Sequence, residues 1–212
     1  NVFTCGVQGT ISASATDFDF YQLGTPAAGS RVFAMADGGS ALTTPNFDMR
    51  ITTTVDTLEF DNGDNAVPYG SSSPNIAGRA LTGVASFIRM NNPTQTTEPY
   101  RLYSVIQPSG AGLGGTSATP EVEPNDTLPT ATTAPNNFFS GSLASTAEFD
   151  LYSFTATAGD VVFLSMDSDP LRNLTPVDGI LLLADSTGAV VAGVDDVTTS
   201  SSNTTGAGSL TA

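Results

Sequence analysis

Oxygen-bearing side chains cluster in two short stretches near the middle of this chain, and their chemistry suits a calcium ion. Calcium takes about six to eight oxygen ligands from carboxylates, amides, backbone carbonyls and water. Glu148 and Asp150 are two apart in a strand-like run, so their side chains project from one face. If the acidic lead-in (Glu121–Thr127) packs across that strand, the side-chain oxygens of the lead-in converge with those of Glu148 and Asp150. The candidate ligands are Glu121, Glu123, Asn125, Asp126, Glu148 and Asp150.

Other acidic positions are weaker metal candidates. Asp17 and Asp19 repeat the spacing of the later strand pair, but no acidic lead-in precedes them. Asp61–Asp64 reads DNGD, and its Asn-Gly step favours a hairpin turn over a metal loop. For the lead-in itself, the alternative is a solvated acidic linker beside a surface strand.

The residues needed for common catalytic mechanisms are missing. The chain has no histidine and no lysine, which excludes Ser–His and Cys–His nucleophiles, Schiff bases and Walker-type phosphate loops. Paired carboxylates can hydrolyse glycosides, but nothing distinguishes such a pair among the many acidic turn residues. We therefore expect the protein not to be an enzyme.

The charge balance limits the partners further. Six arginines against 21 acidic residues give a net charge of −15. Nucleic acids and anionic membranes are poor partners because both attract clustered positive charge. No apolar run approaches the roughly 18 residues of a membrane helix, so we expect no membrane insertion. An acidic surface suits divalent cations, although solubility alone explains it equally well.

The single cysteine, Cys5, rules out an internal disulfide. We expect a buried small side chain there, and the alternative is an intermolecular disulfide with another chain.

Short alternating runs predict an all-β fold. The runs are rich in Val, Ile, Phe, Tyr and Thr, are bounded by Gly, Asn, Asp or Pro, and never sustain a helical period. Their regular spacing favours β-sandwiches. The predicted strands are Thr10–Ser14, Phe18–Leu23, Arg31–Ala36, Met49–Val55, Ala85–Met90, Tyr100–Ile106, Phe138–Leu143, Phe149–Thr155, Val161–Met166, Gly179–Ala184 and Val190–Val194.

An internal repeat divides the chain. Asp19 and Asp150 are 131 positions apart, and Asp48 and Asp178 are 130 apart, within matching blocks of sequence. We therefore predict a first sandwich over residues 1–107, a Gly/Ser/Thr and then acidic linker over 108–136, and a second sandwich over 137–212. The second copy has no counterpart of Ala85–Met90 or Tyr100–Ile106, so it is expected to lack its closing strands. Either the chain is cut from a longer array, or a neighbouring molecule supplies the strands.

Several motifs follow one another through the second copy. They are Glu121–Thr127 (EVEPNDT), Gly141–Leu143 (GSL), Glu148–Phe154 (EFDLYSF), Gly159–Val162 (GDVV), Asp178–Leu181 (DGIL) and Asp195–Asp196 (DD). In this order and spacing they resemble the bacterial pre-peptidase C-terminal domain family, which includes the collagen-binding domains of clostridial collagenases. The resemblance implies a jelly-roll-like β-sandwich without catalytic activity, found in secreted bacterial proteins. It also implies calcium binding through the lead-in and the following strand, although Glu148 replaces a more usual aspartate.

Two functions follow from this pattern. The first is an extracellular or cell-surface structural module, stabilised by calcium and assembling with copies of itself or neighbouring modules into a fibre or array. The second is an accessory domain that holds a secreted protease or other hydrolase to an extracellular polymer. Exposed aromatic side chains on one sheet would favour the second, and the candidates are Tyr100, Tyr103 and Tyr152.

Overall fold

The computed structural model describes residues 5–37, 47–61, 74–92, 97–173, 175–195 and 209–211. These residues are nearly all in strands, turns and loops, which confirms the all-β prediction. The helical segments among them are two single 3-10 turns, η1 (Leu113–Gly115) and η2 (Leu128–Thr130). Within the described part of the chain, no helix is long and apolar enough to cross a membrane.

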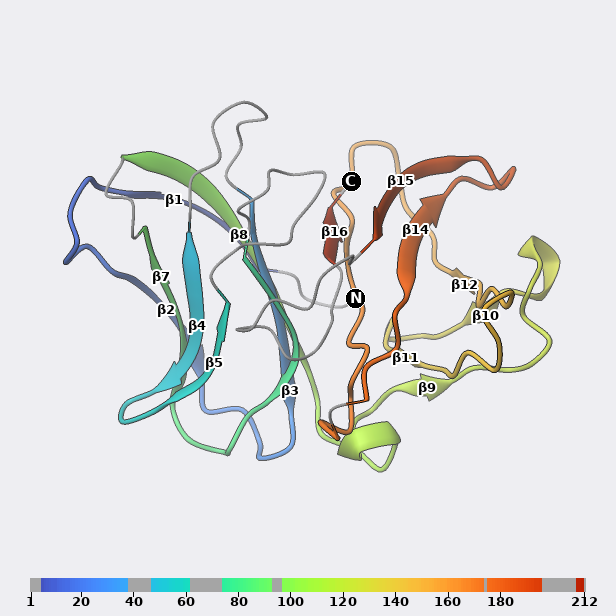
Figure 1. The fold of residues 1–212 in the computed structure, drawn as a ribbon, viewed down its shortest axis with the longest axis horizontal. Helices are drawn as coiled ribbons and strands as arrows, with labels where there is room; N and C mark the ends of the chain where they lie inside the picture. The colour runs from blue at the N-terminus through green and yellow to red at the C-terminus, as the bar shows by residue number, and fades with distance from the viewer. Residues whose placement is uncertain are drawn as a thin grey trace.

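The first part of the chain forms two four-stranded antiparallel sheets packed face to face (Figure 1). One sheet has the order β1-β8-β3-β6 and the other has β2-β7-β4-β5. This is the connectivity of a jelly roll, in which the last two strands lie inside the two sheets. The strands are β1 (Cys5–Ile11), β2 (Asp19–Gly24), β3 (Arg31–Asp37), β4 (Asp48–Thr53), β5 (Thr57–Asp61), β6 (Asn75–Ala80), β7 (Ser86–Asn91) and β8 (Glu98–Gln107).

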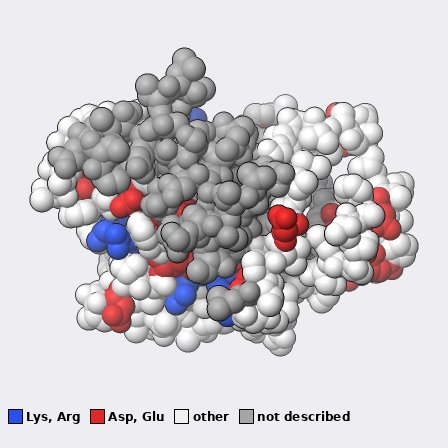
Figure 2. Space-filling view, viewed as in Figure 1, with Lys and Arg blue, Asp and Glu red and all other residues white. Residues whose placement is uncertain are grey.

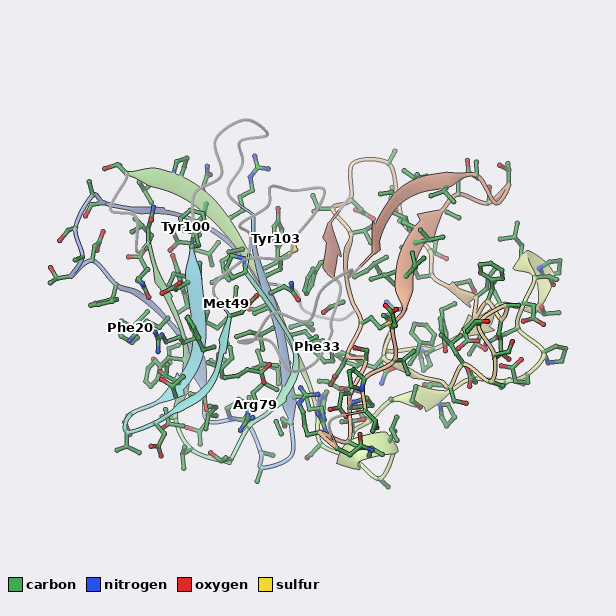
Figure 3. All side chains as sticks on the ribbon, in the orientation of Figure 1. Phe20, Phe33, Met49, Arg79, Tyr100 and Tyr103 are labelled. Carbon is green, nitrogen blue, oxygen red and sulfur yellow. The ribbon has the colours of Figure 1, made fainter. Side chains whose placement is uncertain are left out.

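The core of this first sandwich lies between its two sheets. Alternate residues along each strand point inward, so Met49 and Ile51 on β4 face Leu102 on β8 across the interior. Figure 3 shows Met49 and Tyr100 between the sheets, whereas Phe20 points away from them. The fully buried large side chains are Tyr100, Phe47, Ile11, Met35, Met49, Ile51, Ile76, Leu81, Ile88, Met90 and Leu102.

The remaining described residues, from Pro108 onward, form smaller strand pairs, and we call this part the second half. It lies beside the first sandwich (Figure 1). Its described pairs are β10 with β12, β9 with β11, β13 with β16, and β14 with β15. The strands are β9 (Thr119–Pro120), β10 (Thr132–Thr133), β11 (Phe139–Ser140), β12 (Tyr152–Ser153), β13 (Phe163–Ser165), β14 (Ile180–Ala184), β15 (Val190–Asp195) and β16 (Ser209–Thr211).

The structure differs from the predicted strands at several places. The first strand begins at Cys5 rather than Thr10, and β5 and β6 were not predicted. β6 (NIAGRA) was missed because its Gly and Arg interrupt the apolar alternation. The segment predicted as a linker without secondary structure contains η1, β9, η2 and β10, and two of these pair with strands of the second half.

A cluster of charged side chains joins the two halves. Asp167 lies 2.6 Å from the guanidinium of Arg172 and 3.6 Å from that of Arg31 on β3. Arg172 also lies 4.0 Å from Glu59 on β5, and its guanidinium donates to the Ala77 carbonyl at 2.8 Å. On the face shown in Figure 2, arginines lie over the first sandwich and near its boundary with the second half, and carboxylates lie on both halves, including the end of the second half away from the first sandwich.

Candidate metal centre

Backbone hydrogen bonds hold the lead-in (Glu121–Thr127) against neighbouring segments of the second half. The Glu121 amide donates to the Ser140 carbonyl at 2.8 Å, and the Leu151 amide donates to the Asn125 carbonyl at 3.2 Å. Just after the lead-in, the Thr132 amide donates to the Leu151 carbonyl at 2.8 Å. The lead-in therefore lies against the segment that carries Glu148 and Asp150. This segment was predicted as part of a strand, but in the structure it is irregular and β12 begins only at Tyr152.

This crossing brings all five predicted carboxylates into two overlapping groups. Carboxylate oxygens of Glu121, Glu123 and Asp150 lie within 4.8 Å of one another, and so do those of Glu123, Asp126 and Glu148. Two oxygens bound to one calcium at about 2.3–2.6 Å each are separated by at most about 5 Å. Each group therefore has the dimensions of a single calcium site, and Glu123 belongs to both.

Two buried oxygens beside these groups have no hydrogen-bond donor among the described residues. Asn125 is fully buried, and its Oδ1 lacks a hydrogen-bond partner, as does the buried Oδ1 of Asp150. The Asn125 amide donates to the Glu123 carboxylate at 3.1 Å, so this residue adjoins both groups. Burying a polar atom without a partner costs free energy, and a cation bound at these oxygens would supply the missing partner.

The remaining contacts hold the carboxylates in place. Glu121 accepts hydrogen bonds from the Ser142 amide at 2.7 Å and from the Tyr152 hydroxyl at 3.0 Å. Glu148 accepts from the amides of Ala144 and Ser145 in the preceding turn. Tyr152 was not predicted as part of this site. Its signal in the sequence was the Asp150-x-Tyr152 spacing, which places both side chains on one face.

The closely spaced carboxylates of this site raise the pKa values of neighbouring acidic groups. Partial burial, a hydrogen bond with Glu121 and the nearby charges of Glu121, Glu123 and Glu148 raise the pKa of Asp150 to about 6. Burial and the carboxylate of Glu121 raise the pKa of Tyr152 as well. Ionised carboxylates packed this closely repel one another, so the site stores repulsion that a divalent cation would relieve.

The weaker candidates, Asp17 and Asp19, accept hydrogen bonds within the first sandwich. Asp17 accepts from the Ser12 amide at 2.6 Å, and Asp19 accepts from the Tyr100 hydroxyl at 2.5 Å. Neither belongs to a group of three potential ligands within the described ranges. Asp61 accepts from the Asn75 amide at 2.6 Å, and the rest of the DNGD segment lies outside the described residues. The side chain of Cys5 also lies outside them, so its predicted burial or disulfide stays a prediction.

The aromatic candidates for polymer binding are not exposed. Tyr100 is buried in the core of the first sandwich. Tyr103 is half-buried and stacks on Phe163 of the second half, with ring centroids 6.3 Å apart. Tyr152 is half-buried against Phe139, with ring centroids 4.6 Å apart. These three tyrosines therefore give the polymer-binding alternative no exposed aromatic platform, and polymer binding stays a prediction.

The chain matches no protein-family model, and a comparison with curated proteins finds no match either. The similarity of the second-copy motifs to the pre-peptidase C-terminal domain family therefore stays a resemblance.

Proposed function

We propose that this chain is a non-catalytic structural module of a secreted or cell-surface protein, in which calcium fastens the lead-in to the segment that carries Glu148 and Asp150. The observation that carries the proposal is the convergence of five carboxylates from two segments beside the fully buried Asn125. The jelly-roll connectivity of the first sandwich and the absence of histidine and lysine from the chain agree with a structural role.

Calcium would act here by cancelling repulsion between segments that the backbone already holds together. The inner group, Glu121, Glu123 and Asp150, is the stronger site because Glu121 and Asp150 are half-buried. The lead-in contributes Glu121 and Glu123, and the irregular segment just before β12 contributes Asp150, so one ion would join both. Calcium bound only to the folded state stabilises that state in proportion to the logarithm of its concentration.

A calcium titration by isothermal calorimetry, paired with thermal melting, tests the proposal. We expect saturable calcium binding and a higher melting temperature for the parent chain. Glu123→Gln should weaken binding by at least about tenfold, or about 1.4 kcal/mol, because Glu123 belongs to both carboxylate groups. Asp126→Asn should weaken binding less, because Asp126 is exposed and belongs only to the outer group, Glu123, Asp126 and Glu148.

Asp178→Asn is the matched control, since it also changes a carboxylate to an amide at an exposed position of the second half outside both groups. It should bind calcium like the parent. Binding absent from the parent, or unchanged in Glu123→Gln, would contradict the proposal. The accessory polymer-binding function has no comparable support, because its three tyrosine candidates are packed against other side chains.

A further inference from the structure

The outer face of the sheet β2-β7-β4-β5 carries a row of phenylalanine and arginine side chains. Phe20 on β2 lies opposite Arg89 on β7. Arg89 lies opposite Arg50 on β4, which in turn lies opposite Phe60 on β5. The neighbours of these residues along each strand are buried or pack against the core, so the four side chains project to the outside. We call these four residues the outer row.

Both arginines of the outer row stack on phenylalanine rings. The guanidinium of Arg50 lies 4.2 Å from the ring centre of Phe60, and the guanidinium of Arg89 lies 4.8 Å from the ring centre of Phe18. A guanidinium that stacks through its flat face keeps the N–H donors at its edge for a carboxylate. The outer row therefore presents two adjacent cations that aromatic rings hold in place.

The first sandwich neutralises these two cations only in part. Like charges directly opposite each other in a sheet repel, and burial together with the charge of Arg50 lowers the pKa of Arg89. The carboxylate of Asp48 offsets the charge of Arg89, which also donates to the Asn91 side chain at 3.3 Å. None of the ion pairs among the described residues includes Arg50.

The same face is open to solvent and partly apolar. Phe20 is 58% exposed and Phe18 is 40% exposed. Figure 3 shows Phe20 on the side of the sheet that faces away from the core. Exposed aromatic rings beside arginines are typical of protein interfaces, where both residue types are enriched.

The far end of the second half has the complementary character. We call the lead-in and residues 148–150 the acidic end. Its most exposed large apolar side chains, Val122 (70%) and Phe149 (65%), each have an acidic residue on either side in the sequence. The whole second half contains twelve acidic residues and one arginine. Figure 1 shows β2 and β7 at one end of the long axis of the molecule, and β10 and β12, which adjoin the acidic end, near the other.

We propose that the outer row binds the acidic end of a second copy of this chain. Carboxylates of the acidic end pair with the two arginines, and its exposed apolar side chains cover the exposed phenylalanines. The two surfaces differ and lie at opposite ends of the molecule, so the contact is head-to-tail and repeats from copy to copy in a ring or a filament. This partner goes beyond the structural role proposed above and does not rest on the calcium site.

Sedimentation velocity over a concentration series, at low salt and with a calcium chelator, tests the proposal. We expect the parent chain to associate as its concentration rises, and salt to weaken the association because it screens exposed charges. Arg50→Glu combined with Arg89→Glu should weaken the association by at least about tenfold. Arg101→Glu is the matched control, because it reverses an exposed arginine on β8 of the other sheet, and it should associate like the parent.

A charge exchange separates loss of the contact from loss of the fold. Val122→Arg combined with Asp126→Arg adds positive charge to the acidic end at two exposed positions, so this variant alone should also stay monomeric. Its mixture with the Arg50→Glu/Arg89→Glu variant joins opposite charges again and should associate.

A parent chain that stays monomeric would overturn the proposal, and so would association that persists unchanged in Arg50→Glu/Arg89→Glu. A mixture of the two reversed variants that does not associate would overturn the pairing of the outer row with the acidic end. Retention of a monomeric parent on an acidic polysaccharide resin, lost in Arg50→Glu/Arg89→Glu, would show that a polymer covers this face instead of a second copy. Because the assay contains a chelator, its failure leaves the calcium titration unaffected, and a failed titration leaves this proposal standing.

Discussion

The Asp-x-Tyr pair of the internal repeat has different partners in the two copies. In the first sandwich, the Tyr100 hydroxyl donates to Asp19, so a protein group supplies the contact that the carboxylate needs. In the second half, the Tyr152 hydroxyl donates to Glu121 of the lead-in, and the Glu121 carboxylate adds negative charge beside Asp150. Tyr100 lies on β8, a strand without a described counterpart in the second half. The same repeated residues thus support packing in one copy and a candidate cation site in the other.

Glu59 gives a residue-level prediction on pH. Burial is the main reason that its pKa rises to about 7 from an ordinary 4.5, although Arg172 and Arg79 oppose the shift. The folded state keeps a proton that the unfolded state releases, so the free energy of unfolding falls as pH rises from about 4.5 to about 7. Glu59→Gln holds the neutral form and should remove this part of the pH dependence, on the order of 1–3 kcal/mol.

Urea unfolding at about pH 5 and about pH 8 measures this difference. Asp56→Asn, at an exposed carboxylate just before the same strand, should keep the parent's pH dependence. A Glu59→Gln variant with an unchanged pH dependence would show that Glu59 titrates normally in the fold.

At the scale of elements, a glycine lies opposite the tyrosine hydroxyl in both copies. A Cβ at Gly9 would lie 2.5 Å from the Tyr100 hydroxyl and 2.7 Å from that of Tyr21. A Cβ at Gly141 would collide with the Tyr152 hydroxyl and with Glu121. Only glycine allows the backbone of the neighbouring segment to approach this closely. In the second half, this close approach lets β11 lie beside the lead-in.

Gly141→Ala should therefore displace Glu121 from the inner carboxylate group. We expect calcium affinity to fall by about tenfold, or about 1.4 kcal/mol, with little change in the unfolding of the first sandwich. Calorimetric titration measures the affinity. Ser142→Ala is the comparison, because it keeps the backbone amide that donates to Glu121 at 2.7 Å and removes only the longer hydroxyl contact at 3.4 Å. Equal affinities in the two variants would refute this role of Gly141.

The elements were predictable where apolar alternation was strong. β3, β4, β7 and β8 fall within a residue or two of the predicted ranges, whereas β5 and β6 were missed. The site depended on a contact that no local pattern contains. Spacing alone paired Glu148 with Asp150, but the position of the lead-in depends on hydrogen bonds such as that between Leu151 and Asn125. The Asp150-x-Tyr152 spacing linked these two side chains, but the contact of Tyr152 with Glu121 followed from the packing of the lead-in.

At the scale of the whole molecule, one charge cluster connects the two halves. Asp167 and Arg31 each have side chains only 8% exposed, and Arg31 donates to the Gly78 carbonyl at 2.7 Å and the Pro170 carbonyl at 2.6 Å. Three of the six arginines, Arg31, Arg79 and Arg172, belong to this cluster. A strongly acidic chain thus places half of its positive charge where its two parts meet.

Asp167→Asn should weaken this contact between the halves. The change leaves two arginines without their shared carboxylate, and removing one partner of a buried ion pair costs up to about 3 kcal/mol. Urea unfolding should show the loss, and hydrogen exchange should rise in β6, whose carbonyls accept from Arg31 and Arg172. Asp178→Asn, an exposed position of the second half, should change neither measurement. Parent-like behaviour of Asp167→Asn would mean that the cluster does not hold the halves together.

Terbium luminescence tests most directly whether a cation binds between the lead-in and the segment that carries Glu148 and Asp150. Terbium replaces calcium at oxygen sites, and a nearby aromatic ring sensitises its emission. The chain has no tryptophan, and the Tyr152 hydroxyl lies 3.0 Å from Glu121 and 3.4 Å from Asp150. We expect tyrosine-sensitised emission that calcium displaces, that Tyr152→Phe largely removes and that Tyr103→Phe retains. Emission that calcium does not displace, or that persists in Glu123→Gln and Tyr152→Phe, would contradict a calcium site at these residues.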